Sequence, residues 1–178
     1  EKKDSPTGAV EMEAGTYRIL AESADLPVDI TLPELNVTIE TLLDYRPLTL
    51  RHPRVKAVLR VQNAVIESFR SFLKSRGFTE FQAPKILAGD AEGGASVMKV
   101  DYLGYQASLA QSPQLYKQIM VGVCERAFTT GSAFRGEPHS TTRHMNEYTS
   151  LDFEMGFIES HLDVMRTEND WLLSLEKE

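Results

Sequence analysis

The clearest pattern along the chain is a helical repeat of apolar residues between Pro53 and Arg76. Nine apolar residues recur at spacings of three and four, which places them on one wide helix face. They are Val55, Val58, Leu59, Val61, Val65, Ile66, Phe69, Phe72 and Leu73. Pro53 suits a first helical position and Gly77 a helix end, so the pattern predicts one long amphipathic helix.

Shorter segments with strand or helix signals follow. Alternation and β-forming residues predict strands over residues 78–81, 97–103, 105–110, 127–137 and 147–158. Ser112 and Pro113 begin a second helix that runs to about Val121, and Ser160 with Asp163 caps a last one. Helices mixed with antiparallel-looking strands indicate an α+β fold.

The first 52 residues have no comparable periodicity. Two strand-like stretches, 8–13 and 16–20, flank Ala14-Gly15 and predict a hairpin, and prolines break the pattern after it. Two strands alone seldom form a stable unit. We therefore expect residues 1–52 to be a remnant or a linker, and residues 53–178 to form the main domain.

Composition narrows the class of protein. The 178 residues suit one domain, and 19 basic against 26 acidic residues give a net charge of −7, which argues against a broad nucleic-acid-coating surface. No apolar run approaches the roughly 20 residues of a membrane span, so we expect no membrane partner. The single cysteine, Cys124, excludes an intramolecular disulfide and a multi-thiolate metal site, and it suits a reducing cytoplasm.

Charged residues gather on one face of the last two predicted strands. Alternation gives them a common side, opposite an apolar one, and they are Arg135, Glu137, Asp152 and Glu154. The connecting loop adds His139, Arg143 and His144. Arginine matches phosphate oxygens bidentately, which favours a polyphosphate site. A solvated face with surface ion pairs would show the same pattern, so both interpretations stay open.

Two smaller clusters could hold a polar ligand. Gln114, Lys117 and Gln118 lie three and four apart on the predicted helix, hence on one face. Glu92 stands beside Gly93-Gly94, where adjacent glycines permit an unusual backbone. An ordinary exposed helix face and a plain surface turn are the alternatives.

Taken in order, these segments resemble the catalytic domain of class II aminoacyl-tRNA synthetases, specifically aspartyl-tRNA synthetases of the archaeal and eukaryotic type. Residues 77–84 look like motif 1, whose proline, here Pro84, lies at the dimer interface of that family. Phe134-Arg-Gly-Glu137, followed by His144-x3-Tyr148-x3-Asp152, looks like motif 2, a hairpin that holds ATP. Residues 92–95 resemble the loop that closes over the amino acid, and residues 111–118 the aspartate-binding helix.

The resemblance implies roles for individual residues. Arg135 would contact the ATP α-phosphate as the catalytic residue, Glu137 would hold the adenine end, and Arg143 or His144 would reach the terminal phosphates. For the amino acid, Lys117 would bind the side-chain carboxylate, and Gln114 with Glu92 would hold the α-ammonium.

The implied function is aspartate–tRNA ligation: ATP activates aspartate to aspartyl-adenylate, and the aspartyl group passes to tRNA. The resemblance also implies a cytoplasmic homodimer with the class II antiparallel sheet flanked by helices. Residues 1–52 would be a remnant of an N-terminal OB-type anticodon-binding domain plus a linker, and residues 53–178 the N-terminal part of the catalytic domain. No Gly-x-Gly-x-x-Arg segment, the family's motif 3, occurs in the sequence. The Mg²⁺ ligands are therefore expected beyond Glu178, no metal site is expected here, and we expect the fragment to be inactive alone.

Two alternatives to this function remain. A cation such as Lys117 favours aspartate over asparagine, because a carboxylate gains a charge-assisted hydrogen bond that a neutral amide does not. An asparaginyl-tRNA synthetase is therefore the nearest rival. A non-catalytic, synthetase-like module for dimerisation or regulation is the alternative outside the enzymes.

Overall fold

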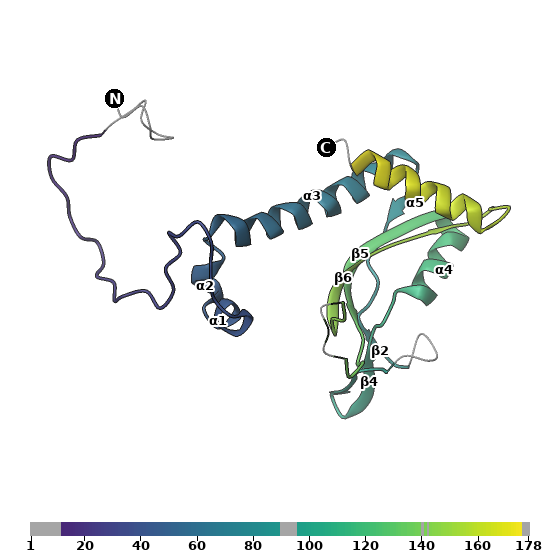
Figure 1. Cartoon of the computed structure of the whole chain (residues 1–178). Coiled ribbons are helices and arrows are strands. Elements are labelled where there is room, and N and C mark those ends of the chain that lie inside the picture. Colours follow the sequence, from purple (N-terminus) through teal and green to yellow (C-terminus); the bar gives the residue numbers. More distant parts are fainter. Residues whose placement is uncertain (1–11, 90–95, 140, 142, 176–178) are drawn as a thin grey trace. The chain divides into compact units, whose positions relative to one another are not determined.

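The computed structural model describes residues 12–89, 96–139, 141 and 143–175. The chain divides into two compact units, Glu1–Lys56 and Ala57–Glu178 (Figure 1). The predicted domain boundary after residue 52 and the OB-type assignment of the first segment stay predictions. None of the described helices is both long and apolar enough to cross a membrane.

The first unit contains two short helices, α1 (Ile39–Asp44) and α2 (Arg46–Thr49). The Thr38 hydroxyl caps α1 by accepting a hydrogen bond from the Thr41 amide at 3.3 Å. Thr49 and His52 are buried, and they bind the carbonyl oxygens of Leu42 and Leu32 at 2.8 and 2.9 Å. Polar side chains bound to backbone thus fix this segment.

The predicted N-terminal hairpin is wrong where the structure describes it. Residues 12–20 form no strand and are exposed, and residues 8–11 lie outside the described part. An isolated pair of strands is marginal in water unless a third strand or a helix covers its apolar face. The described residues 12–20 are exposed on every side chain and have no such cover.

The second unit is built on the sheet β1-β5-β6 (Figure 1). Strand β1 (Thr79–Glu80) pairs in parallel with β5 (Arg126–Phe134), and β5 pairs in antiparallel with β6 (Glu147–Met155) over nine residue pairs. A smaller antiparallel sheet has the order β2-β4-β3, with β2 Ile86–Leu87, β3 Lys99–Tyr102 and β4 Tyr105–Leu109. The predicted α+β class is confirmed.

Helices pack against both faces of the β5–β6 hairpin. The long predicted helix is confirmed as α3 (Pro53–Ser75), and the capped last helix as α5 (His161–Leu175). Phe69 of α3 packs edge-on against Phe128 of β5 and Trp171 of α5, at centroid distances of 5.8 and 5.1 Å. Helix α4 (Gln114–Cys124) contacts the other face, because its Lys117 reaches Asp152. The apolar face therefore forms the core, and the polar face remains available for a site.

Tertiary hydrogen bonds end both long strands earlier than predicted. The Arg135 amide still donates to the Asn146 carbonyl, but the Gly136 amide donates to Ser96 and leaves the ladder. At the other end the Gly156 amide donates to Glu125, and Phe157 takes a left-handed φ of 55° and points into solvent. The predicted strands 127–137 and 147–158 are thus too long by three residues each.

An ion-pair cluster joins α3 to β1. The Glu80 carboxylate lies 2.8 Å from Arg70 and 3.0 Å from Lys74. Partial burial by itself would raise the pKa of Glu80, but the hydrogen bonds and charges of Lys74 and Arg70 outweigh it and lower the pKa below 4.5. The charged form of Glu80 therefore stabilises the folded chain.

Candidate functional site

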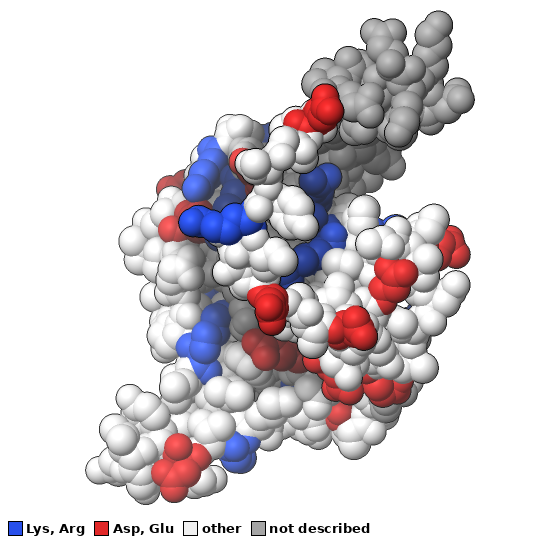
Figure 2. Space-filling view, turned by 90° about the vertical axis from the view of Figure 1, so that its left-hand side faces the viewer, with Lys and Arg blue, Asp and Glu red and all other residues white. Residues whose placement is uncertain are grey.

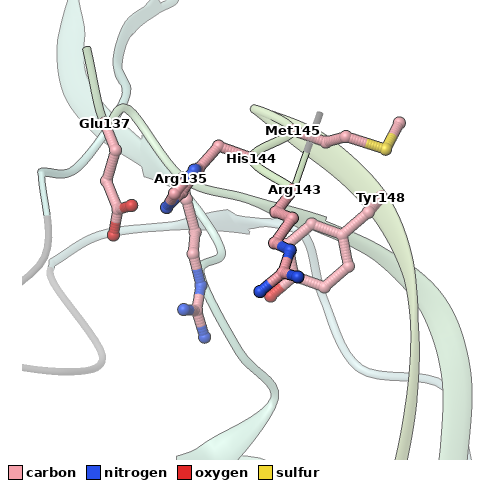
Figure 3. Close-up of a pocket in the computed structure, with 6 residues that line it drawn as sticks. All are labelled: Arg135, Glu137, Arg143, His144, Met145 and Tyr148. Carbon is pink, nitrogen blue, oxygen red and sulfur yellow. The ribbon is translucent and has the colours of Figure 1, made fainter. Parts of the chain in front are cut away.

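A hollow of about 310 Å³ lies where β5 passes into the loop towards β6. Six residues line it: Arg135, Glu137, Arg143, His144, Met145 and Tyr148. Figure 3 shows the guanidinium groups of Arg135 and Arg143 and the Glu137 carboxylate pointing to the same side, whereas Met145 points away. The structure thus brings together all four residues predicted to bind ATP.

A close backbone approach positions Arg135 and Glu137. The Gly136 amide between them donates to the Ser96 carbonyl at 2.8 Å. A Cβ atom on residue 136 would lie 3.0 Å from that carbonyl oxygen, so glycine permits this crossing. The crossing directs the side chains on either side of Gly136 into the hollow.

Aromatic and hydroxyl contacts hold the side chains of Arg135 and His144 and the backbone of Arg143. The Arg135 guanidinium carbon lies 5.8 Å from the centroid of the Tyr148 ring, within the range of a cation–π interaction. In the loop, His144 Nδ1 and the Thr141 hydroxyl are 2.6 Å apart, and that hydroxyl also accepts from the Arg143 amide at 3.2 Å. Two guanidinium groups and an imidazole line one hollow together with the Glu137 carboxylate, and groups of the first two kinds are those that bind phosphate oxygens.

Lys117 forms a second cluster on the same face of the hairpin. Its ammonium group lies 3.3 Å from Asp152 and 3.4 Å from Glu154, and its side chain is only 11% exposed. The Ser150 hydroxyl donates to the other oxygen of Asp152 and holds that carboxylate. Lys117 is therefore fixed, but it is shared between two carboxylates.

The register of the hairpin relates the two clusters. Residues paired across the strands share a face, and Asp152 pairs with Thr129 while Glu154 pairs with Ala127. Counting by twos along β5 from Thr129 reaches Arg135, so all these side chains lie on one polar face. The predicted common face is confirmed for Arg135, Asp152 and Glu154, whereas Glu137 follows the point at which the Gly136 amide leaves the ladder.

The remaining predicted site residues are Gln114, Glu92 and Pro84. Gln114 starts α4, one turn before Lys117 and half-buried. Glu92 lies outside the described residues. Pro84 is exposed between β1 and β2, and its dimer contact stays a prediction.

Tyr148 is a site residue to which the sequence reasoning gave no role. It pairs with Ala133 and lies under Arg135 on the polar face. Strand alternation through Ser150 and Asp152 was a signal that could have identified it.

Within the described part of the chain, no three His, Cys, Asp or Glu side chains converge in a way that could hold a metal ion.

Comparison with known proteins identifies the family. Residues 38–178 match the family of class II tRNA synthetases for D, K and N. The chain belongs to this family. The class II resemblance and the class II fold expected from the sequence are both confirmed.

Individual relatives agree with this placement. The chain is 49% identical over 169 residues to an aspartate–tRNA(Asp/Asn) ligase of Deinococcus radiodurans, covering 94% of this chain and 39% of the relative. Among solved structures it resembles asparaginyl-tRNA synthetase from Pyrococcus horikoshii, complexed with asparaginyl-adenylate (TM-score 0.79, 28% identity, 89% of this chain, 36% of that one). A putative aspartyl-tRNA synthetase from Leishmania major is also similar, with a TM-score of 0.71 and 35% identity over 82% of this chain and 28% of that one. The chain thus spans about two fifths of the length of its curated relative.

Proposed function

We propose that this chain is the N-terminal part of the catalytic domain of an aspartate–tRNA ligase, which activates aspartate with ATP and transfers it to tRNA. The observation that carries the proposal is the pairing of two sites on one sheet face. The Arg135–Arg143–His144 hollow suits a polyphosphate, and the fixed ammonium of Lys117 suits a carboxylate. The curated name of the Deinococcus radiodurans relative supports the same activity.

Activation requires charge stabilisation and positioning from the protein. A carboxylate oxygen of aspartate attacks the α-phosphorus of ATP, and the bond from that phosphorus to the bridging oxygen breaks. Pyrophosphate leaves with the electron pair, so no proton moves in this step. Arg135 would neutralise charge developing on the α-phosphoryl oxygens, while Arg143 and His144 hold the leaving pyrophosphate. Glu137 would hold the adenine end.

The amino acid would lie over the Lys117 cluster. Lys117 would bind the side-chain carboxylate, which favours aspartate over the neutral amide of asparagine. Gln114 and Glu92 would hold the α-ammonium group. Asp152 orients Lys117 through the 3.3 Å ion pair.

The other partners follow from the proposed reaction. Basic and acidic side chains lie beside one another on the face in view in Figure 2, and the chain carries a net charge of −7. We therefore assign most of the tRNA contact to parts outside this chain. ATP with Mg²⁺, homodimerisation through the Pro84 region and a cytoplasmic location complete the proposal.

The test is ATP–pyrophosphate exchange by the complete gene product. Arg135→Gln should reduce the aspartate-dependent exchange rate at least a hundredfold, the typical effect of losing one group that stabilises transition-state charge. Arg166→Gln removes an equally charged arginine that pairs with Asp163 on α5 and is 72% exposed, and it should leave exchange unchanged. Equal exchange rates for both variants would refute the role of Arg135. The 178-residue chain alone should show little or no exchange, because its sequence lacks motif 3.

A further inference from the structure

Lys85 is a cation on the polar sheet face that the proposed mechanism does not yet use. It follows Pro84 on the way from β1 to β2, and its side chain lies over Gly131 of β5. A Cβ atom on residue 131 would lie 3.3 Å from both Cε and Nζ of Lys85. Glycine at this position therefore gives the Lys85 ammonium room to lie directly against the sheet.

The register places this ammonium between the two clusters. Gly131 pairs with Ser150, two residues along β5 from the Thr129–Asp152 pair and four from Arg135. At about 3.3 Å per residue, Lys85 lies roughly 7 Å from the level of Asp152 and roughly 13 Å from that of Arg135. A molecule that lies along this face from the Lys117 cluster to Arg135 therefore crosses the level of Lys85.

The charge of the Lys117 cluster indicates that a second cation is needed. Lys117 already faces both Asp152 and Glu154, so these three groups together carry one net negative charge. Such a cluster attracts the α-ammonium of an amino acid but repels a ligand with two carboxylates. Another positive charge near this cluster would offset its net negative charge and let it accept a ligand with two carboxylates.

Lys85 is held in place and is available for such a ligand. Its carbonyl oxygen accepts a hydrogen bond from the Ala110 amide at 2.9 Å, which fixes the backbone beside the sheet. The side chain is half-buried, and no ion pair or hydrogen bond joins its ammonium to any residue in the described part of the chain. A half-buried ammonium without a partner gains from binding an anion.

We propose that Lys85 binds the α-carboxylate of the amino acid substrate and positions it for attack on the α-phosphorus. The inference rests on the proposed function. Lys117 then binds the side-chain carboxylate, Lys85 the reacting one, and Arg135 the phosphoryl group. Lys85 transfers no proton: it holds the nucleophilic oxygen and offsets the charge of the cluster until the new P–O bond forms and pyrophosphate leaves.

The first test replaces the ammonium in the complete gene product. Lys85→Met should lower kcat/KM for aspartate in ATP–pyrophosphate exchange by roughly a hundredfold while KM for ATP stays within threefold. Lys85→Arg keeps the charge and should recover most of the loss. Lys56→Met removes an exposed lysine and serves as the matched control. Unchanged thermal unfolding of Lys85→Met would exclude a folding defect.

The second test uses the contact with Gly131. Gly131→Ala places a methyl group against the Lys85 ammonium and should lower kcat/KM for aspartate about tenfold in the wild-type background. The same change should add less than a twofold loss to Lys85→Met, because residues that act through one contact are not additive. An equal loss in both backgrounds would show that Gly131 acts independently of Lys85 and would overturn the placement of the Lys85 ammonium against Gly131, on which the inference rests.

The outcomes separate this inference from the proposed function. The wild-type protein can show aspartate-dependent exchange while Lys85→Met has a kcat/KM within twofold of the wild-type value. That result overturns the role of Lys85 and leaves the proposed function standing. Wild-type protein without aspartate-dependent exchange overturns the proposed function, and the inference with it.

Discussion

Replacing Lys117 by Met removes the only charge that lies between Asp152 and Glu154 among the described residues, and it keeps most of the side-chain volume. At 3.3 and 3.4 Å, each ion pair amounts to roughly 5 kcal/mol of Coulomb attraction at an effective dielectric constant of about 20, before desolvation is subtracted. Removing one partner of a fully buried pair costs roughly 3–5 kcal/mol. Because Glu154 is 33% exposed, we expect a loss of about 2–3 kcal/mol of unfolding free energy.

Substrate binding should suffer as well. A lost charge-assisted hydrogen bond of about 1.5–3 kcal/mol corresponds to a rise in KM for aspartate of roughly 10- to 100-fold. Urea unfolding of the chain and ATP–pyrophosphate exchange by the complete gene product measure the two effects. The matched control is Lys74→Met, which breaks a pair with Glu80 whose lysine is 57% exposed; it should cost under about 1 kcal/mol and leave KM unchanged. A Lys117→Met protein with wild-type stability and KM would refute the reasoning.

Three further predictions concern the core, an ion pair and the ATP loop. Phe128→Ala should lower the free energy of unfolding in urea by about 3–5 kcal/mol, because Phe128 is fully buried. Phe157 is 92% exposed, so Phe157→Ala should change that free energy by less than about 0.5 kcal/mol. Equal effects of the two substitutions would contradict the described core. The folded-state pKa of Glu80 is lowered, so its stabilisation is present above pH 4.5 and is lost as the pH falls through the folded-state value. The stability difference between wild type and Glu80→Gln should therefore be constant from pH 5 to 7 and shrink below, and a difference that grows on acidification would contradict the assignment. His144→Ala should raise KM for ATP and leave KM for aspartate unchanged in exchange assays; the reverse pattern would move His144 to the other substrate.

Periodicity predicted the elements that have one buried and one polar face. Helix α3 was predicted to within one residue of its end, because its apolar residues recur through the whole helix. The polar face of β5 and β6 was predicted because alternation separates Asp152 from Phe153. These features depend on residues close together in sequence.

Features set by distant contacts could not be predicted. The strand ends depend on the bonds from Gly136 to Ser96 and from Gly156 to Glu125, which join separate parts of the chain. Helices α1 and α2 are too short for a periodic signal, and only α1 begins at a residue whose side chain caps it. Lys85 was missed for the same reason: only the tertiary structure places it over Gly131.

The choice of amino acid tests the central claim most directly. ATP–pyrophosphate exchange by the complete gene product should be measured with aspartate and with asparagine at matched concentrations. The lysines on the polar face predict exchange with aspartate and at least a hundredfold lower kcat/KM with asparagine. Exchange that prefers asparagine, or no exchange with either amino acid, would contradict the account.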